Sequence, residues 1–244
     1  MAVVSELGEL WDTSNNTAHT VTATPAVDDL IVVIHGMSGW ASGDTSVITD
    51  DQSGTYTQIG ANPLSTGGGT GGALWISIRT ALITSAVSTI FTETPAGSTG
   101  SGLTVLKVTG MLRVGADAAL QNVGQSTQTE NPPVIAFALA TLAGNPIILA
   151  VFGEDNPPAL TPPTGFTETT DTGWATPTSG IEIVFDSDGN TLSSYSWSAG
   201  ALTDHNEVGV ELDTSAAPTG HPAARRWGGI PHMAGQVGHH GGGW

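Results

Sequence analysis

The sequence contains no cysteine, and only five of its 244 residues are lysine or arginine. Without cysteine the chain can form neither disulfides nor thiolate metal sites. Arg79, Lys107 and Arg113 are the only lysine or arginine residues before residue 220, whereas nucleic-acid binding depends on cations that contact phosphates. The same shortage argues against binding to an anionic membrane surface. We therefore expect neither nucleic acid nor a membrane as a partner.

Charge of either sign is scarce. Only 11% of the residues are charged, against roughly 25% in an average globular domain. The 22 acidic residues nevertheless leave a formal net charge of −17. Hydrophobic residues make up 39% of the chain, which is enough to build a core. Neutral polar residues and glycine must therefore cover most of the surface, a composition typical of β-proteins that neighbours partly cover.

Long hydrophobic runs are absent as well. The apolar stretch from Val134 to Leu142 is far too short to span a bilayer. The N-terminal segment contains Glu6 and Glu9 and no cationic stretch before an apolar one, which argues against an ordinary signal peptide. These features predict a soluble protein made in the cytoplasm.

What the chain does contain is a series of short β-branched and apolar runs separated by Gly, Pro, Asn or Asp, the pattern of β-strands. Residues 19–24 alternate strictly, and the continuous apolar run at 29–35 predicts a strand buried on both faces. The segments 50–54 and 186–190 predict hairpin turns, because Asp, Gly and Asn accept the positive φ that such turns need. Residues 116–120 are a candidate for a single helical turn.

About a dozen candidate strands without a long amphipathic helix predict an all-β fold, a two-sheet jelly-roll-like sandwich. Neither a break in composition nor a repeat of fixed period is evident. We therefore expect one β-sandwich domain over residues 17–214. An N-terminal arm precedes it at residues 1–16, and an extended Gly-rich C-terminal tail follows it at residues 215–244.

The C-terminal tail differs from the rest of the chain. From residue 216 on it is Gly-rich and carries four of the seven histidines and two of the five basic residues. It has too little apolar surface to fold alone. Because Arg and Trp dominate interface energies, we expect the tail to bind a partner. The expected partner-binding residues are Arg225, Arg226, Trp227, Ile230, Met233 and Trp244.

One segment has a feature found in enzymes. The apolar run that ends in His35 and Gly36 is similar to the strand and oxyanion loop of α/β-hydrolases. That fold also needs a nucleophile in the pentapeptide Gly-x-Ser-x-Gly on a strand-to-helix turn, and the pentapeptide does not occur here. We therefore expect a strand that leaves the core into a Gly-rich loop.

Paired carboxylates are the second candidate for chemistry, since two of them roughly 5–9 Å apart can hydrolyse a glycoside. All the pairs lie in turn-like segments, where Asp and Asn are favoured for backbone reasons. The pairs are Asp28 with Asp29, Asp50 with Asp51, Glu154 with Asp155, and Asp186 with Asp188. We expect turns at these positions. The segment that begins at Asp186 resembles half of a calcium loop but lacks the later bidentate glutamate.

The remaining candidate for a metal site lies in the tail. Its histidines are His221, His232, His239 and His240, and their spacing matches no common metal motif. The alternative is a three-fold axis that would bring three copies of one histidine together. We expect no metal, no cofactor and no catalytic residue.

Two tryptophans fall in loop-like segments. Trp40 and Trp174 are therefore the candidates for contact with a glycan or a partner. Trp75 and Trp197 fall in strand-like segments, and we expect both in the core.

The order of several segments resembles that of a known group of proteins. An alternating Thr-rich strand is followed by Pro25-Ala-Val-Asp-Asp-Leu-Ile-Val-Val-Ile34, Val47-Ile-Thr-Asp-Asp-Gln-Ser-Gly-Thr-Tyr-Thr57, Leu74-Trp-Ile-Ser-Ile78 and Pro162-Pro-Thr-Gly-Phe-Thr167. Over residues 17–233 the chain resembles β-sandwich structural proteins of tailed bacteriophages and prophages, of the tail, fibre or head-decoration type. The segment Arg225-Arg-Trp-Gly-Gly-Ile-Pro-His-Met233 looks like the short Arg/Gly/aromatic C-terminal peptides of some of them.

The resemblance implies a non-enzymatic structural component of a phage particle, either a head-decoration or minor capsid protein or a tail or fibre protein. It implies other virion proteins as partners, the virion as location, and no catalytic residue. With the tail, it leads us to expect a homo-oligomer, with trimers favoured. The alternative function is a carbohydrate-binding module or adhesin that recognises host-surface glycans. A glycosidase would need two carboxylates that converge in a groove.

Overall fold

The computed structural model describes residues 1–14, 17–41, 43–60, 71–112, 119–128, 132–153, 160–175, 178–198 and 204–215. These residues form fifteen β-strands, so the all-β prediction is confirmed. Among the described residues, no helix has the length and apolar character needed to cross a membrane.

The strands fall into two halves of the chain. The first half contains β1 (Val3–Asp12), β2 (His19–Ala23), β3 (Leu30–Trp40), β4 (Thr45–Asp50), β5 (Tyr56–Gly60), β6 (Gly71–Arg79), β7 (Thr89–Ala96) and β8 (Gly100–Thr109). The second half contains β9 (Leu120–Gln128), β10 (Val134–Ala136), β11 (Ile147–Gly153), β12 (Thr167–Ala175), β13 (Thr178–Asp186), β14 (Ser194–Ser196) and β15 (His205–Leu212).

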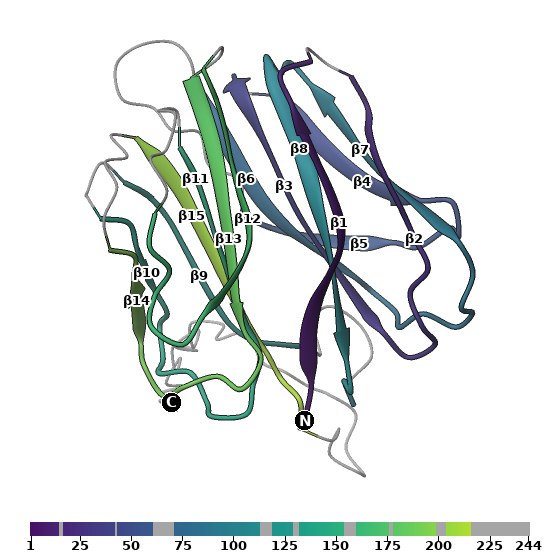
Figure 1. Cartoon of the computed structure of the whole chain (residues 1–244), viewed down its shortest axis with the longest axis vertical. Helices are drawn as coiled ribbons and strands as arrows, with labels where there is room; N and C mark the ends of the chain where they lie inside the picture. Colours follow the sequence, from purple (N-terminus) through teal and green to yellow (C-terminus); the bar gives the residue numbers. More distant parts are fainter. Residues whose placement is uncertain are drawn as a thin grey trace, which may run out of the picture.

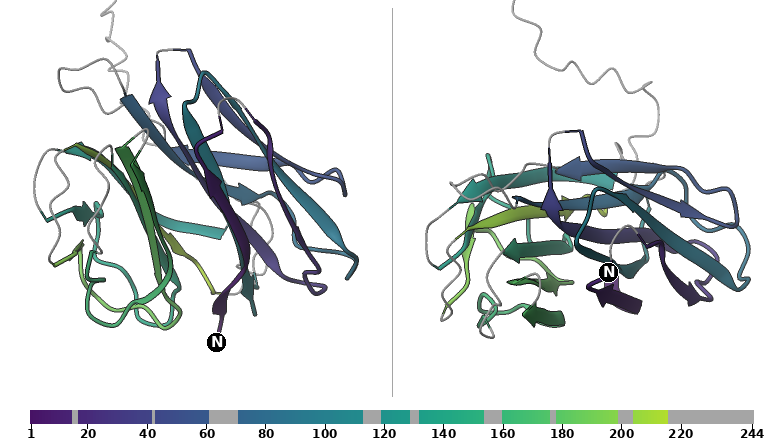
Figure 2. Two further views of the ribbon diagram at one scale, coloured as in Figure 1. Left: turned by 45° about the horizontal axis from the view of Figure 1, so that its top comes forward. Right: turned by 90° about the horizontal axis from the view of Figure 1, so that it is seen from above.

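Each half builds one five-stranded inner sheet and one smaller outer sheet. The N-terminal inner sheet has the order β1-β8-β3-β6-β5, and the N-terminal outer sheet is β2-β7-β4. The C-terminal inner sheet has the order β12-β13-β11-β15-β9, and the C-terminal outer sheet pairs β10 with β14. The four sheets stack as layers, with the inner sheets against each other and an outer sheet on each side (Figure 1, Figure 2).

The two halves have the same topology. Counted from the first strand of each half, the inner sheets run β1-β8-β3-β6-β5 and β9-β15-β11-β13-β12. In the outer sheets β2 pairs with β7, and in the same way β10 pairs with β14. Among the described strands, only β4 has no counterpart. The chain alternates between inner and outer sheet from β1 to β5, from β6 to β8, from β9 to β11 and from β13 to β15. This is the winding of a jelly roll. The described strands therefore form an N-terminal and a C-terminal jelly roll, where the sequence suggested a single sandwich over residues 17–214.

The turns that lead into the central strands β3 and β11 show the same equivalence. In the turns 26–29 and 142–145, the last residue donates its backbone N–H to the carbonyl oxygen of the first, over 3.3 and 3.2 Å. The third residue of each turn, Asp28 or Gly144, has a positive φ of 70° or 84°. Asp and Gly are residues that tolerate this conformation. Both central strands therefore begin from the same local structure.

A carboxylate caps each of these turns, but from a different strand. In the N-terminal jelly roll, Asp29 Oδ2 accepts the first N–H of the turn over 2.8 Å and lies 4.0 Å from Lys107 Nζ on β8. In the C-terminal jelly roll, Glu211 Oε1 on β15 accepts the first N–H of the turn over 2.7 Å and the Asn145 amide over 2.9 Å. β8 and β15 are equivalent strands. The capping carboxylate is therefore on the turn itself in the N-terminal jelly roll and on the neighbouring strand in the C-terminal jelly roll.

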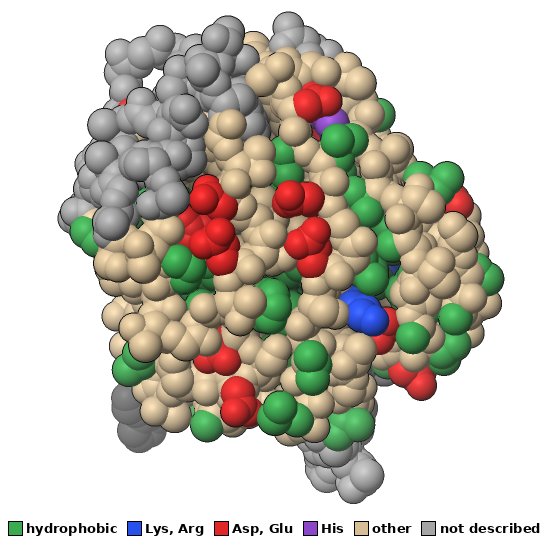
Figure 3. Space-filling model, in the orientation of Figure 1, with side chains coloured by type: hydrophobic (Ala, Val, Ile, Leu, Met, Phe, Trp, Pro, Cys, Tyr) green, Lys and Arg blue, Asp and Glu red, His purple; other side chains and the backbone are tan. Residues whose placement is uncertain are grey.

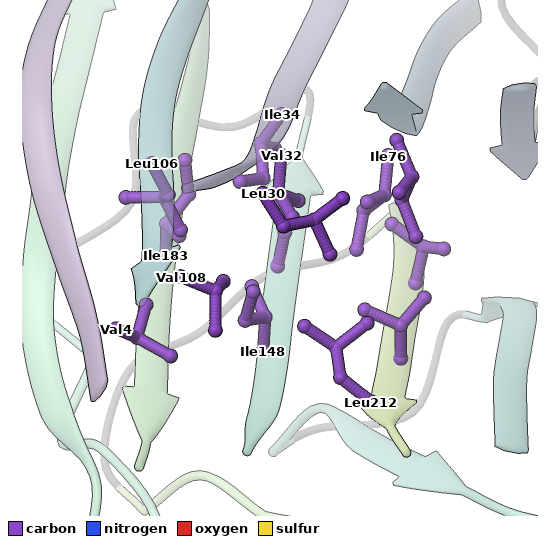
Figure 4. Packing of buried hydrophobic residues seen from close by; sticks show 14 of the residues in the cluster. Val4, Leu30, Val32, Ile34, Ile76, Leu106, Val108, Ile148, Ile183 and Leu212 are labelled. Atoms are coloured by element: carbon purple, nitrogen blue, oxygen red, sulfur yellow. The ribbon is translucent and has the colours of Figure 1, made fainter. Parts of the chain in front are cut away.

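The core with the most members lies between the two inner sheets. Figure 4 shows aliphatic side chains of both sheets pointing toward one another. Buried members from the central strands are Leu30, Val32 and Ile34 on β3, and Ile148, Ala150 and Phe152 on β11. Burial of one Val, Leu or Ile side chain stabilises a fold by about 1.5–3 kcal/mol. This shared core therefore joins the two jelly rolls firmly.

A second core fills each jelly roll between its inner and outer sheets. Ile31 and Val33 on β3 pack there with Phe91 on β7, and Leu149 on β11 packs with Tyr195 on β14. Both central strands are therefore buried on both faces. This confirms the prediction for the apolar run at 29–35.

Two hairpin predictions are wrong. The segment 50–54 does form a turn, but it connects β4 of the outer sheet to β5 of the inner sheet. In the same way, the segment 186–190 connects β13 to β14 in different sheets. Turn residues reverse the chain without selecting the strand that pairs with the one before the turn. In a jelly roll the chain crosses to the other sheet at such places.

The first strand of each half was not predicted from the sequence. Within the expected N-terminal arm, residues 3–12 form the edge strand β1, which pairs with β8. Leu120, the last residue of the expected helical turn, begins the edge strand β9, while residues 113–118 lie outside the described residues. The pairing of β1 shifts register between Glu6 and Gly8. A shift of this kind breaks the alternation by which a strand is recognised.

Candidate functional site

A chain of hydrogen-bonded polar side chains runs through the interior of the N-terminal jelly roll. It takes one residue from each of the strands β6, β3, β4, β7, β2 and β1. In this order the residues are Ser77, His35, Ser46, Glu93, His19 and Asp12, which we call the polar chain. All are buried except Asp12, whose side chain is 41% exposed.

At its inner end the polar chain is neutral. His35 Nε2 lies 2.8 Å from Ser77 Oγ, and His35 Nδ1 lies 2.7 Å from Ser46 Oγ. Ser46 donates its own proton to Glu93 Oε1 over 2.7 Å, so it accepts from His35 Nδ1–H. Ser77 therefore donates to Nε2. Burial lowers the pKa of His35 to about 3, and the neutral ring stacks on Trp75 with centroids 5.3 Å apart.

At its outer end the polar chain carries charge. His19 lies between two carboxylates, 3.0 Å from Glu93 Oε2 and 2.9 Å from Asp12 Oδ1. Burial lowers the pKa of His19, but hydrogen bonds to Glu93 and Asp12 outweigh burial and hold this pKa above its usual value. Burial raises the pKa of Glu93, and His19 offsets the effect only in part.

The order of hydroxyl, imidazole and carboxylate groups is similar to that of a hydrolase relay. However, Ser77 is only 2% exposed and His35 is fully buried, so a substrate has no access to the hydroxyl. The strand β3 also continues past His35 as far as Trp40. The expectation that the strand leaves the core at His35 is therefore wrong. The polar chain connects the outer sheet to the inner sheet.

The second jelly roll shows that the fold does not require this polar chain. By position after the equivalent turns and by strand register, Val151 corresponds to His35 and Val184 to Ser77. Both valines are buried in the core of the C-terminal jelly roll. Apolar side chains therefore occupy these two equivalent positions, and the polar chain is particular to the N-terminal jelly roll.

The C-terminal jelly roll contains a buried acid of its own. Glu182 on β13 is 2% exposed, and its Oε1 accepts a hydrogen bond from Trp197 Nε1 over 2.7 Å. Its Oε2 has no hydrogen-bond partner among the described residues. Burial, together with the charges of Glu168 and Asp171, raises the pKa of Glu182 to about 8. A protonated acid near ionised carboxylates is the combination that glycosidases use, but its burial closes Glu182 to a substrate.

The outer surface of the N-terminal outer sheet is neutral because its ionisable residues point inward. His19 on β2, Asp50 on β4 and Glu93 on β7 are the only ionisable residues of these strands, and all three are buried. Asp50 accepts a hydrogen bond from Arg79 Nε over 3.0 Å. The outward positions are Thr20, Thr22, Thr45, Val47, Thr49, Ile90, Thr92, Thr94 and Ala96, which we call the neutral outer face.

This face departs from the usual pattern of a sheet on the surface of a protein at its ionisable residues, which point inward, and at two aliphatic residues, which point outward. Such sheets direct apolar residues inward and polar residues outward. Here the aliphatic Val47 and Ile90 are 51% and 42% exposed. Strand register places Thr92 between Thr20 and Thr49, so threonines form a row across the three strands. The neutral outer face therefore has the low charge and the exposed aliphatic side chains of a protein interface.

Carboxylates are exposed on another side of the molecule. Glu6 and Glu9 on β1, with Glu168 and Asp171 on β12, are exposed. Figure 3 shows acidic side chains gathered on this side, where the edge strands of the two inner sheets approach each other. The described residues include no group of His, Asp or Glu arranged to hold a metal ion. We call Glu6, Glu9, Glu168 and Asp171 the acidic band; Glu6 and Glu9 accept hydrogen bonds from Thr169 and Thr170 of β12.

The predicted ligand-contacting tryptophans have different outcomes. Trp40 is the last residue of β3 and half-buried, and it packs against Met37, Ala73 and Trp75. Its Nε1 is buried without a hydrogen-bond partner among the described residues. Trp174 lies in β12, but its side chain is outside the described part of the structure.

The other two tryptophans, Trp75 and Trp197, are buried, which confirms their assignment to the core. The six partner-binding residues predicted in the tail (Arg225, Arg226, Trp227, Ile230, Met233 and Trp244) all lie outside the described residues. The four tail histidines do as well.

Most of the predicted carboxylate pairs are turn residues. Asp50 Oδ1 accepts the backbone N–H groups of Gln52 and Gly54 over 3.0 and 2.7 Å, and Asp186 Oδ1 accepts that of Asp188 over 3.0 Å. The cap made by Asp29 is of the same kind. These pairs are confirmed as turns, while the pair at 154–155 lies outside the described residues.

Sequence reasoning missed most of the polar chain. It singled out His35 but none of its partners. Alternation along β7 could have identified Glu93, because it shares a face with the buried Phe91. Its contact with His19 joins residues 74 positions apart in the chain, and only the crossing between sheets brings them together.

Comparison with known proteins does not identify this arrangement. No protein-family model matches the chain, and no curated protein sequence matches it either.

Proposed function

We propose that the protein is a non-enzymatic structural component of a phage particle, which assembles through the neutral outer face and the C-terminal tail. The observation that carries this proposal is the neutral outer face itself. A chain with a net charge of −17 leaves one whole sheet without an outward charge. Depletion of charge and exposure of aliphatic side chains distinguish the centre of a protein interface from ordinary surface.

Other features support a structural role. His35 and Glu182, whose pKa values are strongly shifted, are buried away from any substrate. The inner sheets are covered by each other, so the outer sheets are the faces left for a partner. The order of segments that resembles phage β-sandwich proteins favours other virion proteins as the partners. In this proposal the protein is made in the host cytoplasm and resides in the virion.

The test is the composition of purified particles. Tailed-phage particles from a strain that encodes this chain would be banded by density and analysed by quantitative mass spectrometry. We expect the chain at a constant ratio to the major capsid protein in intact particles. A chain that stays in the soluble fraction while particles band without it contradicts the proposal.

A carbohydrate-binding module or adhesin is the second candidate, favoured by Trp40. Its half-buried ring offers an apolar surface to a ligand. If this function holds, a glycan array gives a specific signal that Trp40→Ala removes while the protein remains folded. Binding that Trp40→Ala leaves unchanged excludes this site.

A further inference from the structure

We infer that the partner on the neutral outer face is a second copy of this chain, bound face to face about a two-fold axis. This rests on the proposed function and names the partner of the same surface. A single self-complementary face does not produce the trimer that was expected from the sequence. A surface that binds itself closes on one partner and forms a dimer.

Charge selects this surface for contact between copies. Each chain carries a net charge of −17, so two copies repel each other at most approaches. The acidic band, with Glu6 and Glu9 on β1, would place like charges opposite one another. The strands of the neutral outer face bring no outward carboxylate into the contact, because Asp50 and Glu93 point inward. The exposed Asp51, which follows β4 and accepts the Ile90 N–H, lies at the end of this face. Over the three strands themselves, an acidic or basic partner would find no charge to recognise.

The chemistry of this face is complementary to itself. A threonine hydroxyl both donates and accepts hydrogen bonds, so the row of Thr20, Thr92 and Thr49 can pair with an identical row. Val47 and Ile90 supply the apolar area that an interface core needs. A partner without matching hydroxyl and aliphatic groups would leave some of these groups unsatisfied.

The two jelly rolls of one chain already associate in the same manner. Their inner sheets pack face to face, and they are equivalent sheets of equivalent units. The outer sheets differ, because β4 extends only the N-terminal one, while β10 and β14 have three residues each. Each chain therefore has one extended outer sheet.

The test measures self-association of the full-length chain by sedimentation velocity over a concentration series. We expect a monomer–dimer equilibrium that Val47→Glu weakens by about tenfold or more, because two added carboxylates face each other across the axis. Val3→Glu is the matched control, since Val3 is also a strand valine, 45% exposed, on β1. It should leave the dimer unchanged. Thr45→Glu at the start of β4 serves as a second variant if Val47→Glu lowers the melting temperature.

The other outcomes overturn the inference in distinguishable ways. A dimer that survives both charge variants on β4 but is lost on Trp227→Ala with Trp244→Ala assigns self-association to the tail. A wild-type chain that remains monomeric up to its solubility limit excludes a second copy as the partner. If that monomeric chain is nevertheless present in particles, the proposed function stands and its partner is another virion protein.

Discussion

Glu93 on β7 and Glu182 on β13 are buried acids, one in each jelly roll, with opposite surroundings. Glu93 has a histidine and a hydroxyl within hydrogen-bond distance. Glu182 has an indole on one oxygen and like charges nearby. Burial raises the pKa of both, so the folded chain holds these protons more tightly than the unfolded chain does. The stability that these two acids contribute should therefore decline as the pH rises.

Glu182→Gln tests this at one residue. The pKa of Glu182 is about 8 when folded, against a usual 4.5, so its contribution to stability is complete below about pH 4.5 and is lost as the pH rises toward 8. At about 1.4 kcal/mol per unit, the penalty has an upper limit of about 5 kcal/mol. Urea unfolding at about pH 8 should show Glu182→Gln as more stable than wild type, with little difference at about pH 4.

Glu6→Gln is the control for that comparison, because Glu6 is an exposed acid on β1. It should change the pH dependence little. A Glu182→Gln variant that is less stable than wild type at both pH values would mean that the ionised carboxylate stabilises the fold.

The two histidines of the polar chain should titrate at widely separated pH values. His19 has a raised pKa, so its contribution to stability is complete below about pH 6.5 and is lost as the pH rises through its folded value. His35 should stay neutral until about pH 3. Ring resonances in two-dimensional NMR spectra, assigned with His19→Gln and His35→Gln, measure both. A His35 resonance that moves between about pH 5 and pH 8 contradicts its burial.

At the scale of elements, alternation of residue types predicted which residues of a strand are buried but not which strand it pairs with. In β2 the strict alternation of residues 19–24 agrees with the structure, where His19 and Val21 are buried and Thr20 and Thr22 are exposed. The hairpin expected after β4 failed, because the turn at Asp50 connects different sheets. Partners such as Ser46 and Ser77, on either side of His35, are 11 and 42 residues away from it. Local periodicity contains no information on such contacts.

Two substitutions in β4 test its attachment. Ile48 is buried in the core of the N-terminal jelly roll, so Ile48→Ala should destabilise the protein by about 2–5 kcal/mol. Val47→Ala removes only exposed surface and should change stability by about 0.5 kcal/mol or less. Urea unfolding compares them. Equal effects would mean that β4 does not pack on the inner sheet as described.

At the scale of the whole molecule, the sequence did not reveal that its two halves share a topology. Equivalent positions differ in residue type, as with Asp29 and Asn145, or Lys107 and Glu211. The inserted β4 also removes any fixed spacing between equivalent strands. A repeat of this kind is visible only in strand order, turn geometry and the position of the capping carboxylate.

A double-mutant cycle tests this equivalence. Lys107→Glu alone places a second carboxylate beside the buried Asp29 and should destabilise the protein. Adding Asp29→Asn recreates the arrangement of Glu211 and Asn145. The double variant should be more stable than the sum of the single effects predicts, by about 1 kcal/mol or more. Asp29→Asn with Lys107→Ala is the control without a cap. Additive effects would argue against equivalent sites.

The core between the inner sheets has a consequence for local motion. β3 and β11 each have a paired strand on both edges and a packed layer on both faces. Their amide hydrogens can exchange with solvent only when this core opens, and opening it exposes both jelly rolls at once. Native-state hydrogen exchange should therefore find β3 and β11 equally protected, with one opening free energy for both halves of the chain.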